Sequence, residues 1–328
     1  MTSGSVAVEN FVSRFLADFE GDPSTQVDRL VSASSGLDAH GMLSALGHPA
    51  VAAAGRTFGV QLMADLMHPT NSIYFDSIYG AYRGQRDIRG WLVPTMTSVP
   101  FLQFVPTHEA HVFADGTGRA SVDEWKMVID PTAIGGEGDP IDVGRGVSVR
   151  RYNDGWINWS CDVYDTGPFR TDPNAGLPPV PEVAWVVDTA VPESRARDVD
   201  FEADCRRFHP TDCEYHDPIF GTFRGREAIT SWLLDVMPKC GDIVFEPLGP
   251  IFDDGEVFVQ EWMQKAILPD GSRVEMTRGT SVRRSRDGWV VYASDYFDTA
   301  PLSNPTVLAA AAACGSTLSM DDILRYRS

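Results

Sequence analysis

The sequence has few cysteines, and they follow no motif. There are five, an odd number, and no two are spaced as CxxC: Cys161, Cys205, Cys213, Cys240 and Cys314. This pattern excludes a paired disulfide framework and a zinc site of the CxxC type. We therefore expect free thiols in a reducing compartment.

Positive charge and long hydrophobic runs are also scarce. The chain has 27 Lys and Arg against 46 Asp and Glu, a net charge of −19, and no Lys/Arg-rich run. Such a charge repels nucleic acid and anionic membranes. No apolar run approaches the roughly 18 residues of a membrane span, and the opening MTSGSVAVENF lacks the features of a signal peptide. We predict a cytoplasmic protein without a nucleic-acid or membrane partner.

What the chain does have is an internal repeat. The stretch HPTNSIYFDSIYGAYRGQRDIRGWLVPTM begins at His68, and HPTDCEYHDPIFGTFRGREAITSWLLDVM begins at His209; they share 13 identities in 29 ungapped positions. Later blocks repeat in the same order: VDEWKM with VQEWMQ, and GRGVSVRRYNDGWINWSCDVYDTGP with TRGTSVRRSRDGWVVYASDYFDTAP. Repeated blocks in a constant order indicate two homologous domains in tandem.

The length of 328 residues also suits two domains. We place domain 1 at residues 1–168, with a helical N-terminal extension, and a Pro- and Gly-rich linker at 169–198. Domain 2 then covers 199–302, and a helical tail follows at 303–328.

Each copy has the same predicted order of elements. A short extended segment leads to a glycine turn, and a helix follows on which Ile88, Trp91, Leu92 and Met96 form one apolar stripe. Strand-like runs come next, and the last two form a hairpin whose tip is YNDG or SRDG, since Asp-Gly favours a tight turn. This order predicts an α+β fold with about four antiparallel strands in each half.

The YxDPxxGxxRG segment, the helix after it and the closing strand that ends in DYFD resemble the SnoaL-like branch of the NTF2-like superfamily. The resemblance covers roughly residues 68–168 and 209–301. It implies two tandem cones, each a curved antiparallel sheet with helices closing a pocket. Family members commonly dimerise through the sheet, so the resemblance also implies an internal pseudo-dimer and a possible homodimer.

Three families within this superfamily point to particular acids. Asp217 in HDPIFG lies where ketosteroid isomerases carry their general base, and Asp76 in FDSIYG matches it without the proline. Asp295 in SDYFD resembles the water-activating base of limonene-type epoxide hydrolases, and Asp162 repeats it. Polyether epoxide hydrolase/cyclases pair their first acid with a Glu, a place taken here by Glu246.

The sequence departs from two of these patterns. No acid matches the oxyanion partner of the isomerases, because Val147/Ser148 and Thr280/Ser281 occupy that region. The Arg-x-Asp unit of the hydrolases is replaced by Glu261-Trp262-Met263.

Carboxyl groups inside an apolar cone have raised pKa values, and two in one pocket titrate apart, which provides an acid and a base. The candidate catalytic residues are Asp217, Asp295, Glu246, Glu261, Asp76 and Asp162. The aromatic candidates for binding substrate are Tyr215, Trp262, Tyr292, Tyr74, Trp125 and Trp159. Structural roles remain open for these residues: an Asp can close a turn through backbone N–H groups, and aromatic residues commonly pack in cores.

We expect cofactor-independent acid/base catalysis on a small hydrophobic metabolite, of isomerase, cyclase, lyase (dehydratase) or epoxide hydrolase type. The alternative is a non-catalytic small-molecule-binding or scaffold protein of the same superfamily. We expect no metal, because THEAH at 107–111 is one residue short of HExxH.

Overall fold

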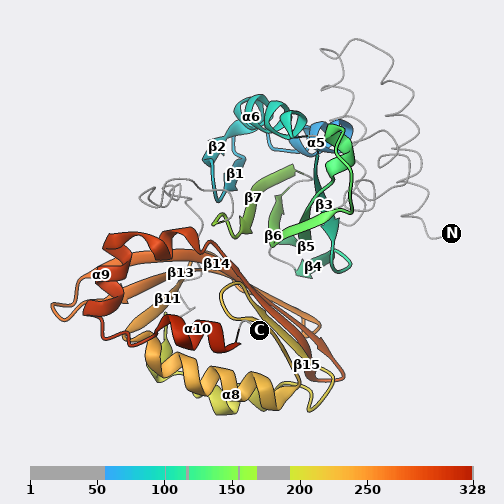
Figure 1. Ribbon diagram of the computed structural model, residues 1–328. Coiled ribbons are helices and arrows are strands. Elements are labelled where there is room, and N and C mark those ends of the chain that lie inside the picture. The colour runs from blue at the N-terminus through green and yellow to red at the C-terminus, as the bar shows by residue number, and fades with distance from the viewer. Residues whose placement is uncertain (1–55, 100, 116–117, 154–155, 168–192, 327–328) are drawn as a thin grey trace, which may run out of the picture. The chain divides into compact units, whose positions relative to one another are not determined.

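The computed structural model describes residues 56–99, 101–115, 118–153, 156–167 and 193–326. The chain forms two compact units, one made mainly of residues up to Asp162 and the other mainly of residues from Val163 onward (Figure 1). Of the helical N-terminal extension, only the end falls within these ranges, as a helix at Arg56–Asp65. The predicted linker lies largely outside them.

The first unit contains three groups of elements in chain order. They are α5 (Arg56–Asp65), β1 (Ile73–Asp76), β2 (Gly80–Arg83) and α6 (Gly84–Ser98); then β3 (Leu102–Pro106), β4 (His111–Asp115) and β5 (Gly118–Ile129); then η2 (Pro131–Ile134), β6 (Ile141–Asn153) and β7 (Trp156–Tyr164).

The second unit repeats this order and adds elements at both ends. They are β8 (Ser194–Arg195), η3 (Ala196–Asp198), α7 (Phe201–Cys205), β9 (Glu214–Asp217), β10 (Gly221–Arg224), α8 (Arg226–Val236), η4 (Met237–Cys240), β11 (Ile243–Pro247), β12 (Phe252–Asp253), β13 (Val257–Ile267), β14 (Arg273–Arg286), β15 (Trp289–Phe297), η5 (Ala300–Ser303), α9 (Pro305–Ala313) and α10 (Met320–Tyr326). The end of the predicted linker is thus an edge strand, because β8 pairs with β11.

The two sheets have the same strand order. The first runs β2-β1-β7-β6-β5-β3 and the second β10-β9-β15-β14-β13-β11-β8, with β4 and β12 pairing with the long strands β5 and β13. Most neighbours are antiparallel, but β1 runs parallel to β7 and β9 runs parallel to β15. Each unit is therefore a curved α+β cone, in which the first short strand of the repeat lies beside its last long strand.

Local irregularities explain how the second sheet bends. The register of β13 and β14 shifts at Gln264/Lys265, and that of β14 and β15 shifts at Arg284/Ser285. An extra residue on one strand of a pair bends that strand and increases its twist. The predicted hairpin tip is present, since Asp287 (φ 53°) and Gly288 (φ 79°) both have the positive φ that a tight turn joining two twisted strands requires.

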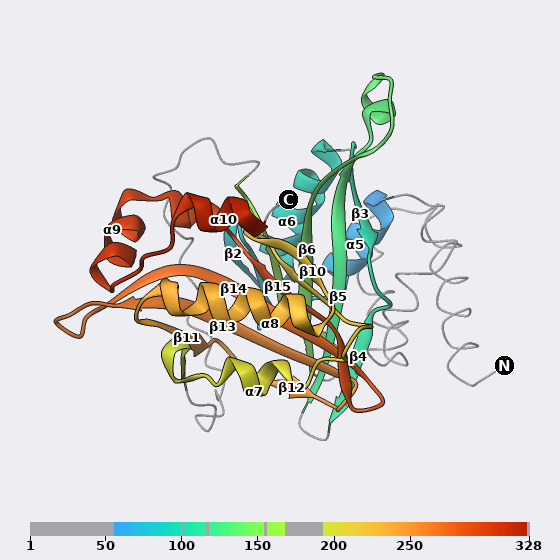
Figure 2. The ribbon, with the colours of Figure 1, turned by 60° about the horizontal axis from the view of Figure 1, so that its bottom comes forward.

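The helix after the second turn supplies the core of each cone. In the second unit, Ile229, Trp232, Leu233 and Val236 of α8 are buried against the sheet, as the apolar stripe predicts. The indole of Trp232 stacks on Phe223 at 4.3 Å between ring centroids and meets Tyr215 at 5.0 Å. Figure 2 shows α8 lying across the strands of this sheet. This packing fixes β9, which carries the site described below.

The C-terminal tail contains two helices. Helix α9 buries Val307 and Ala310 against a cluster that includes Ile243, Ala266 and Met276 of the second sheet. Helix α10 returns toward α8 (Figure 1).

Candidate functional site

Tyr215 and Asp295 meet on the face of the second sheet that α8 covers. Strands β9 and β15 are parallel, with Tyr215 opposite Ala293 and His216 opposite Ser294. Since side chains alternate along a strand, Tyr215, Asp217, Ala293 and Asp295 share one face. The hydroxyl of Tyr215 donates to Asp295 Oδ2 at 2.5 Å. The repeat therefore places both aspartates of domain 2 side by side on adjacent strands.

Asp295 has a hydrogen-bond donor on each oxygen. Besides Tyr215, the hydroxyl of Ser281 donates to Oδ1 at 2.6 Å. Ser281 in turn accepts from Trp262 Nε1 at 2.9 Å. Because an indole N–H can only donate, this bond leaves the serine proton to point at the carboxylate. Trp262, Ser281 and Tyr215 together orient Asp295 as an acceptor.

Burial raises the pKa of Asp295, while the hydroxyls of Ser281 and Tyr215 and the charge of Arg283 oppose that rise. Burial and the neighbouring charge of Asp295 raise the pKa of the Tyr215 hydroxyl well above its usual value, so it keeps its proton. Arg283 itself forms an ion pair with Asp204 of α7 at 3.2 Å. Asp295 is thus half-buried and hydrogen-bonded on both oxygens.

A glycine makes the Trp262–Ser281 bond possible. Gly279 lies directly opposite Trp262 in the β13–β14 ladder. A Cβ at this position would lie 2.3 Å from the indole ring and 2.8 Å from the carbonyl oxygen of Tyr296. Only a residue without a side chain lets the indole lie across the strand and reach Ser281.

Asp217 closes the turn between β9 and β10 with one oxygen. Its Oδ1 accepts from the backbone N–H of Ile219 at 2.8 Å and of Phe220 at 2.9 Å. The other oxygen, Oδ2, has no hydrogen-bond partner among the described residues. Burial, chiefly, and then the charge of Asp295 raise the pKa of Asp217 to about 7, against the lowering effect of the two amides. Asp217 therefore fixes a turn and still has an oxygen available for proton transfer.

The first unit repeats this arrangement. Tyr74 donates to Asp162 Oδ2, and Trp125 Nε1 donates to Ser148 Oγ at 3.0 Å. Asp76 lies directly opposite Asp162 on the parallel pair β1–β7, and its Oδ1 accepts from Ile78 N at 2.8 Å and Tyr79 N at 3.0 Å. The turn-closing role of the first aspartate is therefore common to both copies.

The charges around the two sites differ. In the first unit Arg150 pairs with Asp123 on β5, the neighbouring strand. The residue at the place of Asp123 in the second unit is the uncharged Gln260. Burial is the largest cause that raises the pKa of Asp162, and Asp123 raises it further, whereas Arg150 lowers it. Asp162 Oδ1 is buried without a hydrogen-bond partner in the described part of the chain. The two copies therefore share a framework but not an electrostatic environment.

Comparison with known proteins identifies the fold of the second unit. Residues 194–293 match the family model of the SnoaL-like domain. The second unit is a SnoaL-like domain of the NTF2-like superfamily. The first unit has the same strand order. Among curated proteins, none matches the chain.

Several solved structures resemble the chain over about the length of one SnoaL-like unit. TerC, co-crystallised with polyporic acid, is 24% identical, covers 32% of this chain and 85% of its own, and has a TM-score of 0.27. A Catenulispora acidiphila protein with a ketosteroid isomerase-like fold, in complex with trimethylamine, is 19% identical over 38% of this chain and 88% of its own, with a TM-score of 0.28. A putative polyketide cyclase from Sinorhizobium meliloti is 25% identical over 29% and 81%, with a TM-score of 0.23.

Two predicted acids lie away from the aspartate pair of the second SnoaL-like unit. Glu246 has a side chain that is 41% exposed and forms an ion pair with Lys265 at 2.8 Å. Glu261 is buried but lies on the opposite face of β13, because it neighbours Trp262, whose ring lies on the aspartate face. The structure does not bring either glutamate together with Asp217 and Asp295.

The aromatic candidates also divide between the two faces. Tyr74, Tyr215, Trp125 and Trp262 lie on the faces that carry the aspartates. Tyr292 and Trp159 alternate to the other face: Tyr292 shares a hydrogen bond with Tyr296 at 3.1 Å, and Trp159 lies under Arg151 at 5.6 Å. These last two pack within the other face of each sheet.

Sequence reasoning missed Ser148, Ser281 and Gly279. The signal was present, because both copies contain the same Arg-Gly-x-Ser-Val-Arg-Arg pattern. Within the described residues, no group of three or more His, Cys, Asp or Glu is placed to hold a metal ion. None of the helices in that part of the chain is long and apolar enough to cross a membrane.

Proposed function

We propose that the second SnoaL-like unit is a cofactor-independent acid/base catalyst that acts on a small hydrophobic molecule, with Asp217 as the group that transfers the proton. The observation that supports this proposal is that the two carboxyl oxygens of Asp217 have different surroundings. Its Oδ1 is occupied by two backbone N–H groups, and its Oδ2 has no partner among the described residues.

The pKa of Asp217 suits this role. Burial, with a contribution from Asp295, raises it to about 7. A carboxyl group with a pKa near neutral pH is populated in both forms and accepts or returns a proton with little penalty. An Asp with an ordinary pKa is a much weaker base.

Asp295 is the partner of Asp217 in this proposal rather than a second proton carrier. Both of its oxygens accept hydrogen bonds, from Tyr215 and from Ser281. Its negative charge disfavours ionisation of Asp217. Asp295 therefore raises the pKa of the base Asp217, and Trp262 and Ser281 hold Asp295 in place.

The chemistry common to isomerisation, cyclisation, dehydration and epoxide opening is the removal of a proton from carbon or water and its return elsewhere. One carboxyl group with a near-neutral pKa performs both steps in turn. Tyr215 and Trp262 are the aromatic neighbours of the pair, so we expect a flat, largely apolar substrate.

A specific observation also favours the alternative of a non-catalytic binding protein. Glu246 is engaged by Lys265 at the surface, and Asp295 has a donor on each oxygen. Of the aspartate pair, this leaves Asp217 Oδ2 as the single oxygen without a partner among the described residues. In that case the unit binds the same class of ligand without changing it. The internal pseudo-dimer stays a prediction of the tandem repeat.

The deciding experiment combines a ligand screen by thermal shift with a turnover assay on the hits. It uses the full-length protein, Asp217→Asn, Asp295→Asn and, as the matched control in the first unit, Asp76→Asn. We expect Asp217→Asn to bind the hits and to lose turnover by about 10²- to 10⁴-fold, the usual contribution of a general base. Asp76→Asn is expected to keep it. Equal binding by all four proteins, with turnover by none, supports the binding protein instead.

A further inference from the structure

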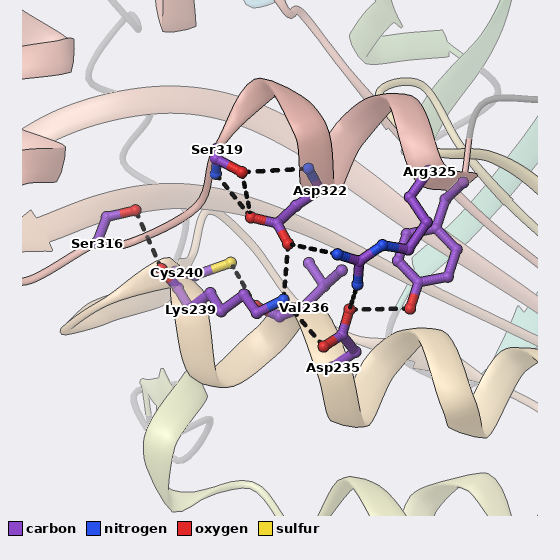
Figure 3. A network of polar contacts seen from close by, with 9 residues as sticks. Asp235, Val236, Lys239, Cys240, Ser316, Ser319, Asp322 and Arg325 are labelled. Carbon is purple, nitrogen blue, oxygen red and sulfur yellow. Dashed lines mark hydrogen bonds and ion pairs between the residues drawn. The ribbon is translucent and has the colours of Figure 1, made fainter.

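The segment after α9 attaches to the end of α8 in the second unit. The backbone N–H of Thr317 donates to the carbonyl of Lys239 at 2.8 Å, and the Ser316 hydroxyl donates to the same oxygen at 3.1 Å. Helix α10 then begins after Ser319, whose N–H and hydroxyl donate to Asp322 Oδ2 at 2.9 and 2.6 Å (Figure 3). These bonds give the final helix a defined start beside α8.

A network of charged groups joins α10 to α8. Lys239 Nζ donates to Asp322 at 2.7 Å and to Asp235 at 2.9 Å. Arg325 donates to Asp235 Oδ2 at 3.0 Å (Figure 3). The Tyr326 hydroxyl donates to the same oxygen at 2.9 Å. Isolated surface ion pairs stabilise little, but Asp235 here gathers three donors from two helices. Its carboxylate orients the side chain of Tyr326.

The ring of Tyr326 packs on the turn that Asp217 closes. Its centroid lies 5.8 Å from that of Phe223 and 6.5 Å from that of Phe220. Phe220 is only 5% exposed, and its backbone N–H is one of the two donors to Asp217 Oδ1. Tyr326 thus contacts the residue that holds the proposed base.

The first unit provides an internal comparison. The residue at the place of Phe220 is Tyr79, and it is 53% exposed although its N–H makes the same bond to Asp76. The places of Asp235 and Lys239 are taken by Pro94 and Ser98, which carry no charge. The covered turn is therefore a feature of the second copy, which is the copy with the proposed base.

We propose that Tyr326 is a positioning residue for Asp217: held by Asp235, its ring keeps Phe220 packed and keeps water away from the turn of the second unit. The inference rests on the proposed function only in taking Asp217 as the base whose position and exposure to water affect activity. It also distinguishes the two copies, since Asp76 closes the same turn beside a Tyr79 that is 53% exposed.

The electrostatic consequence follows from burial. The titratable groups that act on Asp217 or respond to its charge are Asp295 on β15, Tyr215 on β9 and Cys240 after α8. Removing the ring of Tyr326 moves none of these, but it admits water to the turn. Because desolvation is the largest cause of the raised pKa of Asp217, that pKa then falls toward its ordinary value.

The test uses the full-length chain and two readouts. Amide hydrogen exchange at Ile219 and Phe220 reports opening of the turn, and exchange at Ile323 reports release of α10. A ¹³C NMR titration of the Asp217 carboxyl measures its pKa. If Tyr326 only stabilised the fold, its removal would leave this pKa unchanged. The variants are Tyr326→Ala, the conservative Tyr326→Phe and a control on the same helix, Leu324→Ala, at a side chain that is 59% exposed.

We expect Tyr326→Ala to speed exchange at Ile219 and Phe220 by about tenfold or more. The Asp217 midpoint is expected to fall by about 1 unit. Tyr326→Phe keeps the ring and should restore most of both values, and Leu324→Ala should change neither.

Two results would overturn the proposal. One is faster exchange at Ile323 in Tyr326→Ala with the turn amides and the Asp217 midpoint unchanged. The other is a protected turn even in the double variant Tyr326→Ala/Asp235→Asn. The outcome is separable from that of the proposed function: if Asp217→Asn retains turnover while Tyr326→Ala opens the turn, the catalytic role fails and the positioning role stands.

Discussion

Trp262 and Ser281 form a hydrogen bond that determines how Asp295 is held. The indole N–H donates to the serine oxygen at 2.9 Å, and the serine hydroxyl donates onward to the carboxylate at 2.6 Å. The first unit preserves the pair, with Trp125 donating to Ser148 at 3.0 Å. Both copies thus keep the bond from tryptophan to serine, and in the second unit the serine hydroxyl passes it on to the aspartate of the next strand.

Replacing Ser281 with Ala should destabilise the second unit. The change leaves Trp262 Nε1 and Asp295 Oδ1 without their partner, and an unmade bond to buried groups costs about 1–3 kcal/mol in the free energy of unfolding. Urea unfolding measures it. The matched control is Ser272→Ala, which removes a bond of the same length, 2.6 Å to Asp270, from an exposed turn. A loss no larger than that of the control would show that the buried chain of bonds contributes nothing.

Gly279→Ala should disrupt the same region by a steric route. The new Cβ would lie 2.3 Å from the Trp262 ring, so the indole must move away from Ser281. We expect a loss of about 3 kcal/mol in the free energy of unfolding, at the upper end for overpacking. The control Gly90→Ala, in helix α6 with no atom within 4 Å of the new Cβ, should instead stabilise its unit. A neutral Gly279→Ala would contradict the close approach.

The effect of Asp217→Asn on stability should depend on pH. In the wild type, Asp217 has a pKa of about 7 when folded, against 3.8 for an unperturbed aspartate, so between these values the folded state holds a proton that unfolding releases. The contribution of Asp217 to the free energy of unfolding therefore falls as pH rises from about 4 to about 7, by about 4 kcal/mol at most.

Asparagine does not titrate, and its oxygen still accepts from the turn amides. The free energy of unfolding of the variant, relative to that of the wild type, should thus rise steadily from about pH 4 to about pH 7 and stay constant at higher pH. Chemical unfolding at a series of pH values measures the difference. A constant offset between the two proteins would mean that the carboxyl group titrates alike in the folded and unfolded states.

The fold could be predicted from the sequence because it is duplicated. The 13 identities in 29 positions and the later blocks in the same order indicate two copies of one unit. The apolar stripe on α8 predicts which face of this helix packs against the sheet. The parallel pairing of β9 with β15 could not be read from local patterns, since it joins residues about 80 positions apart. That pairing is what brings Tyr215 to Asp295.

The placement of the candidate residues was predictable in part. The motifs single out Asp217 and Asp295, which the structure places on adjacent strands, whereas Glu246 was proposed from its place after the helix, which does not reveal that Lys265 pairs with it. Glu261 lies away from the aspartate pair because side chains alternate along a strand and its neighbour Trp262 faces the aspartates. The hydroxyl of Ser281 was missed because its role depends on Trp262 and Asp295, which lie on the two strands that flank β14 and are distant in sequence.

The pKa of Asp217 is the most direct test of the central claim. A ¹³C NMR titration of the side-chain carboxyl, assigned by the signal lost in Asp217→Asn, measures it in the full-length protein. The account predicts a midpoint near 7, because burial and the charge of Asp295 disfavour the ionised form. A midpoint near 4, the value of a solvated aspartate, would contradict it and leave Asp217 only the closing of a turn.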